Sequence, residues 1–130
     1  MTGIQHVLVL ADDIDAARDF YRDVVGLHVG DRPALEFPGY WMYSGPSACL
    51  HIADRSAYRA HAASVGLEVG VATDGRGAID HIAFAASDAD ELLARIDRSG
   101  VSAVRHQIPS GPSQVFIEDP NGVRVEINIG

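Results

Sequence analysis

Cysteine, basic side chains and long apolar runs are all scarce in this sequence. The single cysteine, Cys49, excludes an internal disulfide and suits a reducing cytosol, so we expect a cytoplasmic protein. The 10 Lys and Arg against 18 Asp and Glu give a net charge of −8, which argues against nucleic acid and against an anionic membrane surface as partners. No apolar run approaches the roughly 18 residues of a membrane span. The segment Met1–Ile4 also lacks the basic region of a signal peptide.

The remaining composition is typical of a folded globular protein. With 130 residues, of which 47% are hydrophobic, the chain is long enough for one domain with a buried core. We therefore expect a single domain over residues 1–130, with no low-complexity segment and no second domain.

The chain contains an internal repeat with an offset of 75 residues (81 − 6 and 126 − 51). His6 and His51 are 45 residues apart (51 − 6), and His81 and Glu126 have the same separation (126 − 81). Three imidazoles and one carboxylate thus occupy related positions in two half-chains. The matching segments around them are Ile4–Val9 with Ile79–Phe84, and Leu50–Ile52 with Val125–Ile127.

Each half-chain predicts the element order β-α-β-β-β. Helix starts are indicated by Asp12 or Asp13 and by Ser87, and helix ends by Gly26 and Gly100. A further helix is expected at Ser56–Val65. The expected strands are Ile4–Leu10, Leu27–Gly30, Leu35–Phe37, Trp41–Ser44 and Ala48–Ala53, then Ile79–Ala85, Val101–Arg105, Gln114–Glu118 and Val123–Ile129.

These elements predict an α+β fold of two tandem βαβββ modules. Module 1 covers about residues 1–54, a connector about 55–78, and module 2 about 79–130. One short helix cannot cover a sheet by itself, so we expect the modules to form a curved mixed sheet with the helices on its convex side. The concave side is then a bowl. Asp119–Gly122 has the residues of a tight turn leading into the last strand.

The first and last strands of each module carry His6, His51, His81 and Glu126, which converge if those strands are central in the bowl. Imidazole and carboxylate are ligands of Zn²⁺, Ni²⁺, Co²⁺, Mn²⁺ and Fe²⁺. Four such ligands leave an octahedral ion about two open positions for substrate oxygens or waters. Glu126 either stays bound or detaches and acts as a base.

Four further side chains are candidates for contacting a small-molecule substrate. Trp41 and Tyr43 lie on a strand near His51, where aromatic side chains either line a pocket or belong to the core. Arg105 and Gln114 are the polar candidates of the second module.

Short motifs cover nearly the full length: Ile4–Val7, Phe20-Tyr21 before Gly26-Leu27, Asp80–Phe84, Gln114–Phe116, Asp119–Gly122 and Val125-Glu126. On these motifs the chain resembles the vicinal oxygen chelate superfamily, which includes glyoxalase I, methylmalonyl-CoA epimerase, extradiol dioxygenases, and fosfomycin and bleomycin resistance proteins. Members of this size are commonly homodimers. The resemblance therefore implies one divalent metal ion, a small-molecule substrate and a homodimer.

Matched motif by motif, the resemblance implies metal ligands at His6, His81 and Glu126, with His51 at the family's variable second position. With His51 bound, it implies lyase or isomerase chemistry, a glyoxalase- or epimerase-like proton transfer beside a metal-bound oxygen. Without His51, two histidines and one carboxylate form the facial triad of an Fe²⁺ ring-cleaving dioxygenase. A third alternative is a metal-free protein that binds a small molecule such as an antibiotic.

Overall fold

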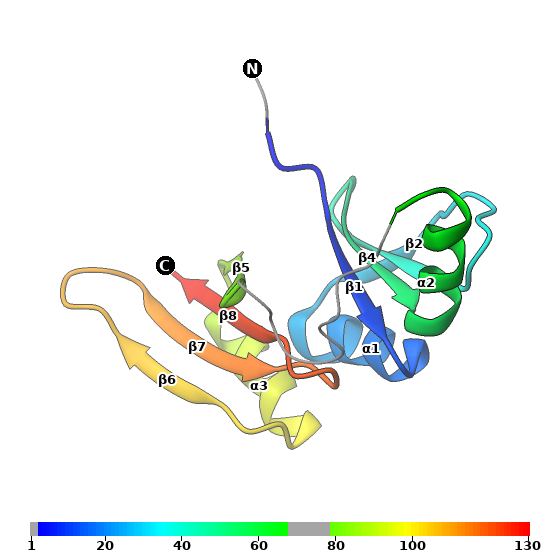
Figure 1. The fold of residues 1–130 in the computed structure, drawn as a ribbon. Coiled ribbons are helices and arrows are strands. Elements are labelled where there is room, and N and C mark those ends of the chain that lie inside the picture. The colour runs from blue at the N-terminus through cyan, green and yellow to red at the C-terminus, as the bar shows by residue number, and fades with distance from the viewer. Residues whose placement is uncertain (1–2, 68–78) are drawn as a thin grey trace. The chain divides into compact units, whose positions relative to one another are not determined.

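The computed structural model describes residues 3–67 and 79–130 (Figure 1). The described residues form two compact units: unit 1 contains residues 3–22 and 27–67, and unit 2 contains 23–26 and 79–130. The part of the predicted connector from 68 to 78 lies outside the described residues. No helix in the described ranges has the length and apolar character needed to cross a lipid bilayer.

Unit 1 is a four-stranded mixed sheet with its helices packed against it. The strand order is β1-β4-β3-β2, in which β1 runs parallel to β4 and the other pairs are antiparallel. Helix α1 packs against β3 and β4, and α2 packs against β1 and β4. The elements are β1 Val7–Ala11, α1 Ile14–Phe20, β2 His28–Gly30, β3 Gly39–Ser44, β4 Ser47–Asp54 and α2 Arg55–Ser64. A π-helical turn, Tyr21–Val25, begins in unit 1 and ends in unit 2.

Unit 2 has the same sheet plan, with the order β5-β8-β7-β6 and a parallel β5–β8 pair. Its core contains Leu92 and Ile96 of α3 together with the alternate residues Val115, Val125 and Ile127 of the sheet. Strand β6 begins later than predicted, because its pairing with β7 starts at residue 104. The elements are β5 His81–Ala86, α3 Ala89–Ser99, β6 Val104–Gln107, β7 Ser113–Glu118 and β8 Arg124–Ile129.

The strand registers preserve the 75-residue offset of the sequence repeat. Leu8 pairs with His51 in unit 1, and Ala83 pairs with Glu126 in unit 2 (83 − 8 and 126 − 51). The parallel strand pair of each unit therefore presents His51 and Glu126 at equivalent positions. The predicted α+β fold of two tandem βαβββ modules is confirmed, in the form of two four-stranded mixed sheets.

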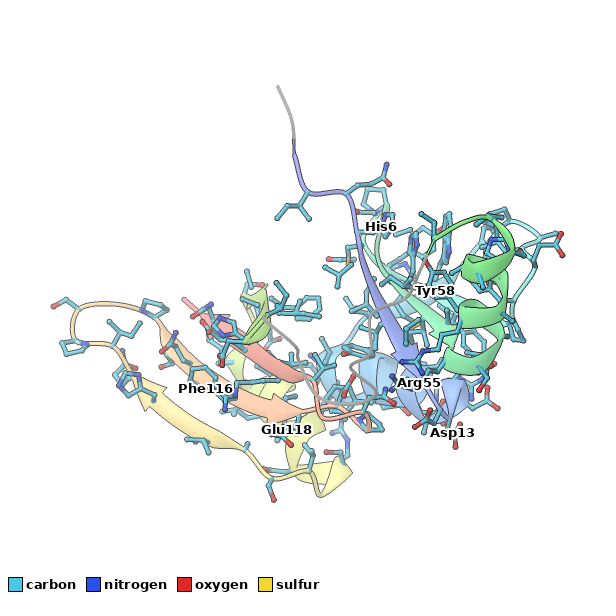
Figure 2. All side chains as sticks on the ribbon, in the orientation of Figure 1. His6, Asp13, Arg55, Tyr58, Phe116 and Glu118 are labelled. Atoms are coloured by element: carbon cyan, nitrogen blue, oxygen red, sulfur yellow. The ribbon has the colours of Figure 1, made fainter. Side chains whose placement is uncertain are left out.

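Helix ends follow the capping signals with one correction. The Asp13 carboxylate accepts a hydrogen bond from the backbone N–H three residues on, as one of the two predicted caps of α1 (Figure 2). The start of α3 is capped by Asp88 instead of the predicted Ser87, and its carboxylate makes the same hydrogen bond. Ser87 therefore lies one residue before the cap, because the helix begins one residue later than predicted. Gly100 ends α3 with a φ of 73°.

The predicted strand Leu35–Phe37 is wrong, because this segment pairs with no strand in the described structure. Pro33 and Pro38 flank it, and proline has no backbone N–H to give to a strand ladder. The Phe37 carbonyl oxygen instead accepts a hydrogen bond from the Arg32 guanidinium at 2.6 Å. Strand β3 consequently starts only after Pro38.

The turn before β8 sets the position of Glu126. Asp119 is buried, and its Oδ1 accepts hydrogen bonds from the backbone N–H groups of Asn121 (2.7 Å) and Val123 (2.8 Å). Gly122 has the positive φ of 84° that reverses the chain. This predicted turn is confirmed, and it fixes the register in which β8 enters between β5 and β7.

Candidate metal centre

In unit 2, two parallel strands place an imidazole against a buried carboxylate. His81 opens β5 and Glu126 lies within β8, and the distance from His81 Nε2 to Glu126 Oε2 is 2.9 Å. The side chain of Glu126 is 10% exposed and that of His81 is 36% exposed. The pair is thus a buried anion with an imidazole at its solvent-facing side.

His81 is held in this orientation by its sequence neighbour. Its Nδ1 lies 2.8 Å from Asp80 Oδ2, and the same Asp80 oxygen accepts a hydrogen bond from Arg124 at 3.1 Å. Both ring nitrogens of His81 therefore face carboxylates. An imidazole that donates from Nδ1 to Asp80 has Nε2 as the nitrogen that a metal ion would bind.

The spacing of the two ligand atoms suits a shared ion. Metal–ligand bonds of about 2.1 Å put two ligands about 3.0 Å apart at a right angle and about 3.4 Å apart at the tetrahedral angle. The 2.9 Å between His81 Nε2 and Glu126 Oε2 is an ordinary hydrogen-bond distance, and it is also short enough for both atoms to bind one ion. The two residues fit the divalent metal that the sequence predicts.

Two side-chain amides hold the other oxygen of Glu126. Gln114 Nε2 on β7 and Asn128 Nδ2 on β8 each lie 2.8 Å from Glu126 Oε1. Gln114 Nε2 also lies 3.2 Å from Asn128 Oδ1, and His106 Nδ1 on β6 lies 3.1 Å from Gln114 Oε1. Of the three residues Gln114, Asn128 and His106, the site prediction from the sequence included Gln114 alone.

In unit 1, the two residues equivalent to the unit 2 pair are His6 and His51, and their rings stack together with a third ring. The centroids of His6 and His51 are 3.9 Å apart, and those of His51 and Trp41 are 4.1 Å apart, with interplanar angles of 13° and 7°. His6, just before β1, lies 3.0 Å through its Nδ1 from Gln5 Oε1 (Figure 2). Gln5 corresponds to Asp80 under the 75-residue offset (80 − 5), so in both units the preceding residue orients the strand histidine.

The environment of His51 favours the neutral imidazole that a metal requires. Burial lowers the pKa of His51 below its ordinary value, and the neighbouring His6 acts in the same direction. Because metal ions bind imidazole at a ring nitrogen in the ring plane, the stacked His6 and Trp41 rings leave the nitrogen edge available.

The remaining predicted substrate contacts are Tyr43, whose own contacts are with Asp31 and His28, and Arg105, which lies on another sheet face from Glu126. The hydroxyl of Tyr43 donates to the Asp31 carbonyl at 2.6 Å, and its ring stacks on His28 with centroids 5.9 Å apart. Arg105 is paired in register with the buried Val115, so it lies on the face of the unit 2 sheet opposite to Glu126.

A cavity of about 690 Å³ lies in unit 2. Its walls include the apolar Val104 and Phe116 and the charged Glu118 and Arg124 (Figure 2). Phe116 is the register partner of Glu126, so both project from the same sheet face. The cavity therefore shares Phe116 with the sheet face that carries Glu126, while Glu126 itself is not one of its lining residues.

Four residues around the site were not predicted from the sequence: Asp80, Asn128, His106 and Phe116. Two of these had an available signal, because Asp80 directly precedes His81 and Asn128 shares the Glu126 face of β8 by simple alternation. The described residues of neither unit bring three His, Cys, Asp or Glu side chains together in one metal-ligating group. Each unit by itself supplies two of the four predicted ligands.

Comparison with known proteins agrees with this fold. A solved lactoylglutathione lyase from Agrobacterium tumefaciens is 29% identical, with a TM-score of 0.74, over 100% of this chain and 95% of that one. The antibiotic binding protein TnmS3 from a Streptomyces species is 19% identical, with a TM-score of 0.68, over 99% and 96%. The fosfomycin resistance protein FosX from Listeria monocytogenes is 16% identical, with a TM-score of 0.69, over 100% and 94%. At these identities the last two show a shared fold alone.

No curated protein matches the chain. The family model described as the Glyoxalase/Bleomycin resistance protein/Dioxygenase superfamily matches residues 3–127. This match covers both βαβββ modules and every predicted ligand. The chain therefore belongs to the glyoxalase, bleomycin resistance protein and dioxygenase superfamily.

Proposed function

We propose that the protein is a divalent-metal-dependent enzyme that moves a proton at a carbon next to an oxygen of a small substrate. The proposed ligands are His6, His51, His81 and Glu126. The metal is one of Zn²⁺, Ni²⁺, Co²⁺, Mn²⁺ or Fe²⁺, all of which accept imidazole and carboxylate ligands.

The observation that carries the proposal is the 2.9 Å approach of His81 Nε2 to the buried Glu126 Oε2. A carboxylate that only faces solvent would stay in water. Glu126 is instead buried against an imidazole whose second nitrogen is already held by Asp80. The orienting carboxylate, imidazole and buried ligand form the arrangement typical of a metal-ligating histidine. The equivalent strand positions of unit 1 carry His6 and His51 in contact.

The metal ion, Glu126 and Phe116 have different roles in the proposed reaction. When bound, the ion supplies Lewis acidity that stabilises negative charge on a substrate oxygen. Glu126 contributes a buried anion whose Oε2 either remains a ligand or accepts the proton that leaves the adjacent carbon. Phe116, beside Glu126 on the sheet, gives the substrate an apolar surface and limits the access of water.

An Fe²⁺ ring-cleaving dioxygenase is the second candidate, and the ring stack in unit 1 favours it. His6 and Trp41 cover both faces of His51, so the ring is held in place without needing a metal bond. If His51 is a wall residue, the two remaining histidines and Glu126 form a facial triad with three open positions.

A metal-free binding protein is the third candidate. The 690 Å³ cavity beside Phe116 is of a size that accepts a small organic molecule without any ion. One of the structures with this fold is an antibiotic binding protein, which makes this alternative a direct competitor of the metal enzyme.

Calorimetric titration of the chelator-treated protein with each of the five ions separates the two metal enzymes from the metal-free binding protein. We expect one ion per chain in the wild type and affinity at least about 100-fold weaker in Glu126→Ala. Glu91→Ala is the matched control, because it removes a unit 2 carboxylate that pairs with Arg95 on α3. Absence of binding by every ion would contradict both enzyme proposals and leave the binding protein.

A reaction assay then separates the two enzymes. Proton transfer predicts deuterium uptake from D₂O at the carbon next to the carbonyl of a probe such as dihydroxyacetone. Oxygen uptake on catechol after anaerobic loading with Fe²⁺, without deuterium uptake, would instead support the dioxygenase.

A further inference from the structure

The two oxygens of Glu126 have different partners. Oε2 faces His81 Nε2 at 2.9 Å, whereas Oε1 accepts a hydrogen bond from Gln114 and another from Asn128, both at 2.8 Å. A carboxylate oxygen accepts about two hydrogen bonds, so the acceptor capacity of Oε1 is used by these amides. Only Oε2 remains available to an ion or a proton.

The orientation of the Gln114 amide is determined by its neighbours. Its Nε2 faces two oxygens, Glu126 Oε1 and Asn128 Oδ1, and a flipped amide would place its own oxygen against both. Its Oε1 faces His106 Nδ1 at 3.1 Å, which donates to it in the tautomer with the proton on Nδ1. A directional chain therefore runs from His106 on β6 through Gln114 on β7 to Glu126 on β8.

Burial gives this network an energetic role. Glu126 is buried, and a buried carboxylate without partners is costly, so its hydrogen bonds offset the cost of its burial. Two donors from two different strands also prevent rotation of the carboxylate, because rotation would break both hydrogen bonds.

Unit 1 has no counterpart of the two amides. Under the 75-residue offset, Gln114 corresponds to Gly39 (114 − 75) and Asn128 to Ala53 (128 − 75). The register pairs Gly39 with Ala53 just as it pairs Gln114 with Asn128. The two amides are therefore not a requirement of the repeated strand pairing, and they occur where the pairing presents a carboxylate.

We propose that Gln114 and Asn128 are positioning residues that hold Oε1 of Glu126 and leave Oε2 as the oxygen that binds an ion or a proton. Gln114 then acts through Glu126 rather than as a substrate contact. The inference rests on the proposed metal site and deepens it: Glu126 ligates through one oxygen, and it remains attached to β7 through Oε1 if Oε2 leaves the ion to take a proton.

The test compares Gln114→Met with Gln107→Met. Methionine matches glutamine in length but has no N–H donor. Gln107 is a matched control because its Nε2 also donates twice, to the Ile108 and Gly111 carbonyls, and makes no contact with Glu126. Co²⁺ is the probe, because its visible spectrum reports the number and kind of its ligands. Crystals of the metal-free proteins give the Glu126 orientation independently of any ion.

We expect about 10-fold weaker Co²⁺ binding and an altered Co²⁺ spectrum in Gln114→Met, with both unchanged in Gln107→Met. In metal-free crystals, the Glu126 carboxylate should be rotated in Gln114→Met and held as described in the wild type. Wild-type spectrum and affinity in Gln114→Met, or an unrotated carboxylate in its crystals, would overturn the inference. If the wild type binds no Co²⁺, the metal proposal fails, whereas the crystals still decide whether the amides hold Oε1.

Discussion

Asp80 offers the sharpest test of how His81 is oriented. Its Oδ2 lies 2.8 Å from His81 Nδ1, so the substitution Asp80→Asn keeps the shape of the side chain and removes its charge. The imidazole then keeps only a neutral acceptor, which holds its Nδ1 more weakly than the charged carboxylate does. Outer partners of metal-ligating histidines change metal affinity by about 10- to 100-fold.

The exposure of Asp80 places the expected effect at the low end of that range. Its side chain is 62% exposed, so water screens the interaction, and we expect about 10-fold weaker Zn²⁺ binding, which is about 1.4 kcal/mol. The free energy of unfolding should change by less than about 1 kcal/mol, because the pairs that Asp80 makes with His81 and Arg124 are at the surface. We therefore expect Asp80→Asn to weaken Zn²⁺ binding while it leaves the free energy of unfolding nearly unchanged.

Calorimetric Zn²⁺ titration and urea denaturation measure the two quantities. Asp12→Asn is the control, because Asp12 also forms an exposed ion pair with an arginine, Arg55, at 2.8 Å, and neither residue is a predicted ligand. Unchanged Zn²⁺ affinity in a folded Asp80→Asn protein would refute the argument that Asp80 orients His81. An equal loss of affinity in Asp12→Asn would show a general charge effect instead.

Three predictions concern the stability of the two units. Tyr40→Phe removes the hydroxyl that donates to Asp15 at 2.6 Å and should lower the free energy of unfolding by about 1 kcal/mol in urea titrations near neutral pH. This hydrogen bond raises the pKa of Tyr40, so the stability difference should be full below the ordinary tyrosine pKa of 10.0 and shrink as pH rises through the folded value; a difference that grows there contradicts the assignment. Leu92→Ala empties a fully buried position of unit 2 and should cost about 2–5 kcal/mol, measured as a lower urea midpoint; a cost well under 1 kcal/mol would show that the position repacks. Gly39→Ala places a Cβ against the Ile52 carbonyl oxygen of the neighbouring strand and should lower the melting temperature. The matched Gly45→Ala meets no atom within 4 Å, so its effect should come from its φ of 56° alone.

The architecture was predictable because it repeats. An offset of 75 residues between two halves implies equal strand order and equal register, and the Leu8–His51 and Ala83–Glu126 pairs obey that rule. The turn at Asp119 was predictable for a local reason, because its residue types satisfy one another within four positions.

The partners of Glu126 were not predictable from spacing. Gln114 reaches Glu126 from another strand, and this contact depends on the register of β7 against β8 and on the rotamers of both side chains. The Trp41–His51 stack was not predictable either, because an aromatic residue on a strand is equally consistent with a core position and with a pocket position. The Ser87 error was local: two adjacent residues are both able to cap α3, and Asp88 is the one whose side chain does so.

The most direct measurement is the metal content of protein purified without added metal or chelator, compared with His51→Ala and Glu126→Ala. The proposed function predicts about one equivalent in the wild type and its loss in Glu126→Ala. Loss in His51→Ala as well supports the four-ligand proton-transfer enzyme, and retention there supports the facial triad and oxygen chemistry. No metal in the wild type, with none taken up from Zn²⁺, Ni²⁺ or Fe²⁺, would contradict both enzymes and leave a protein that binds its small molecule without an ion.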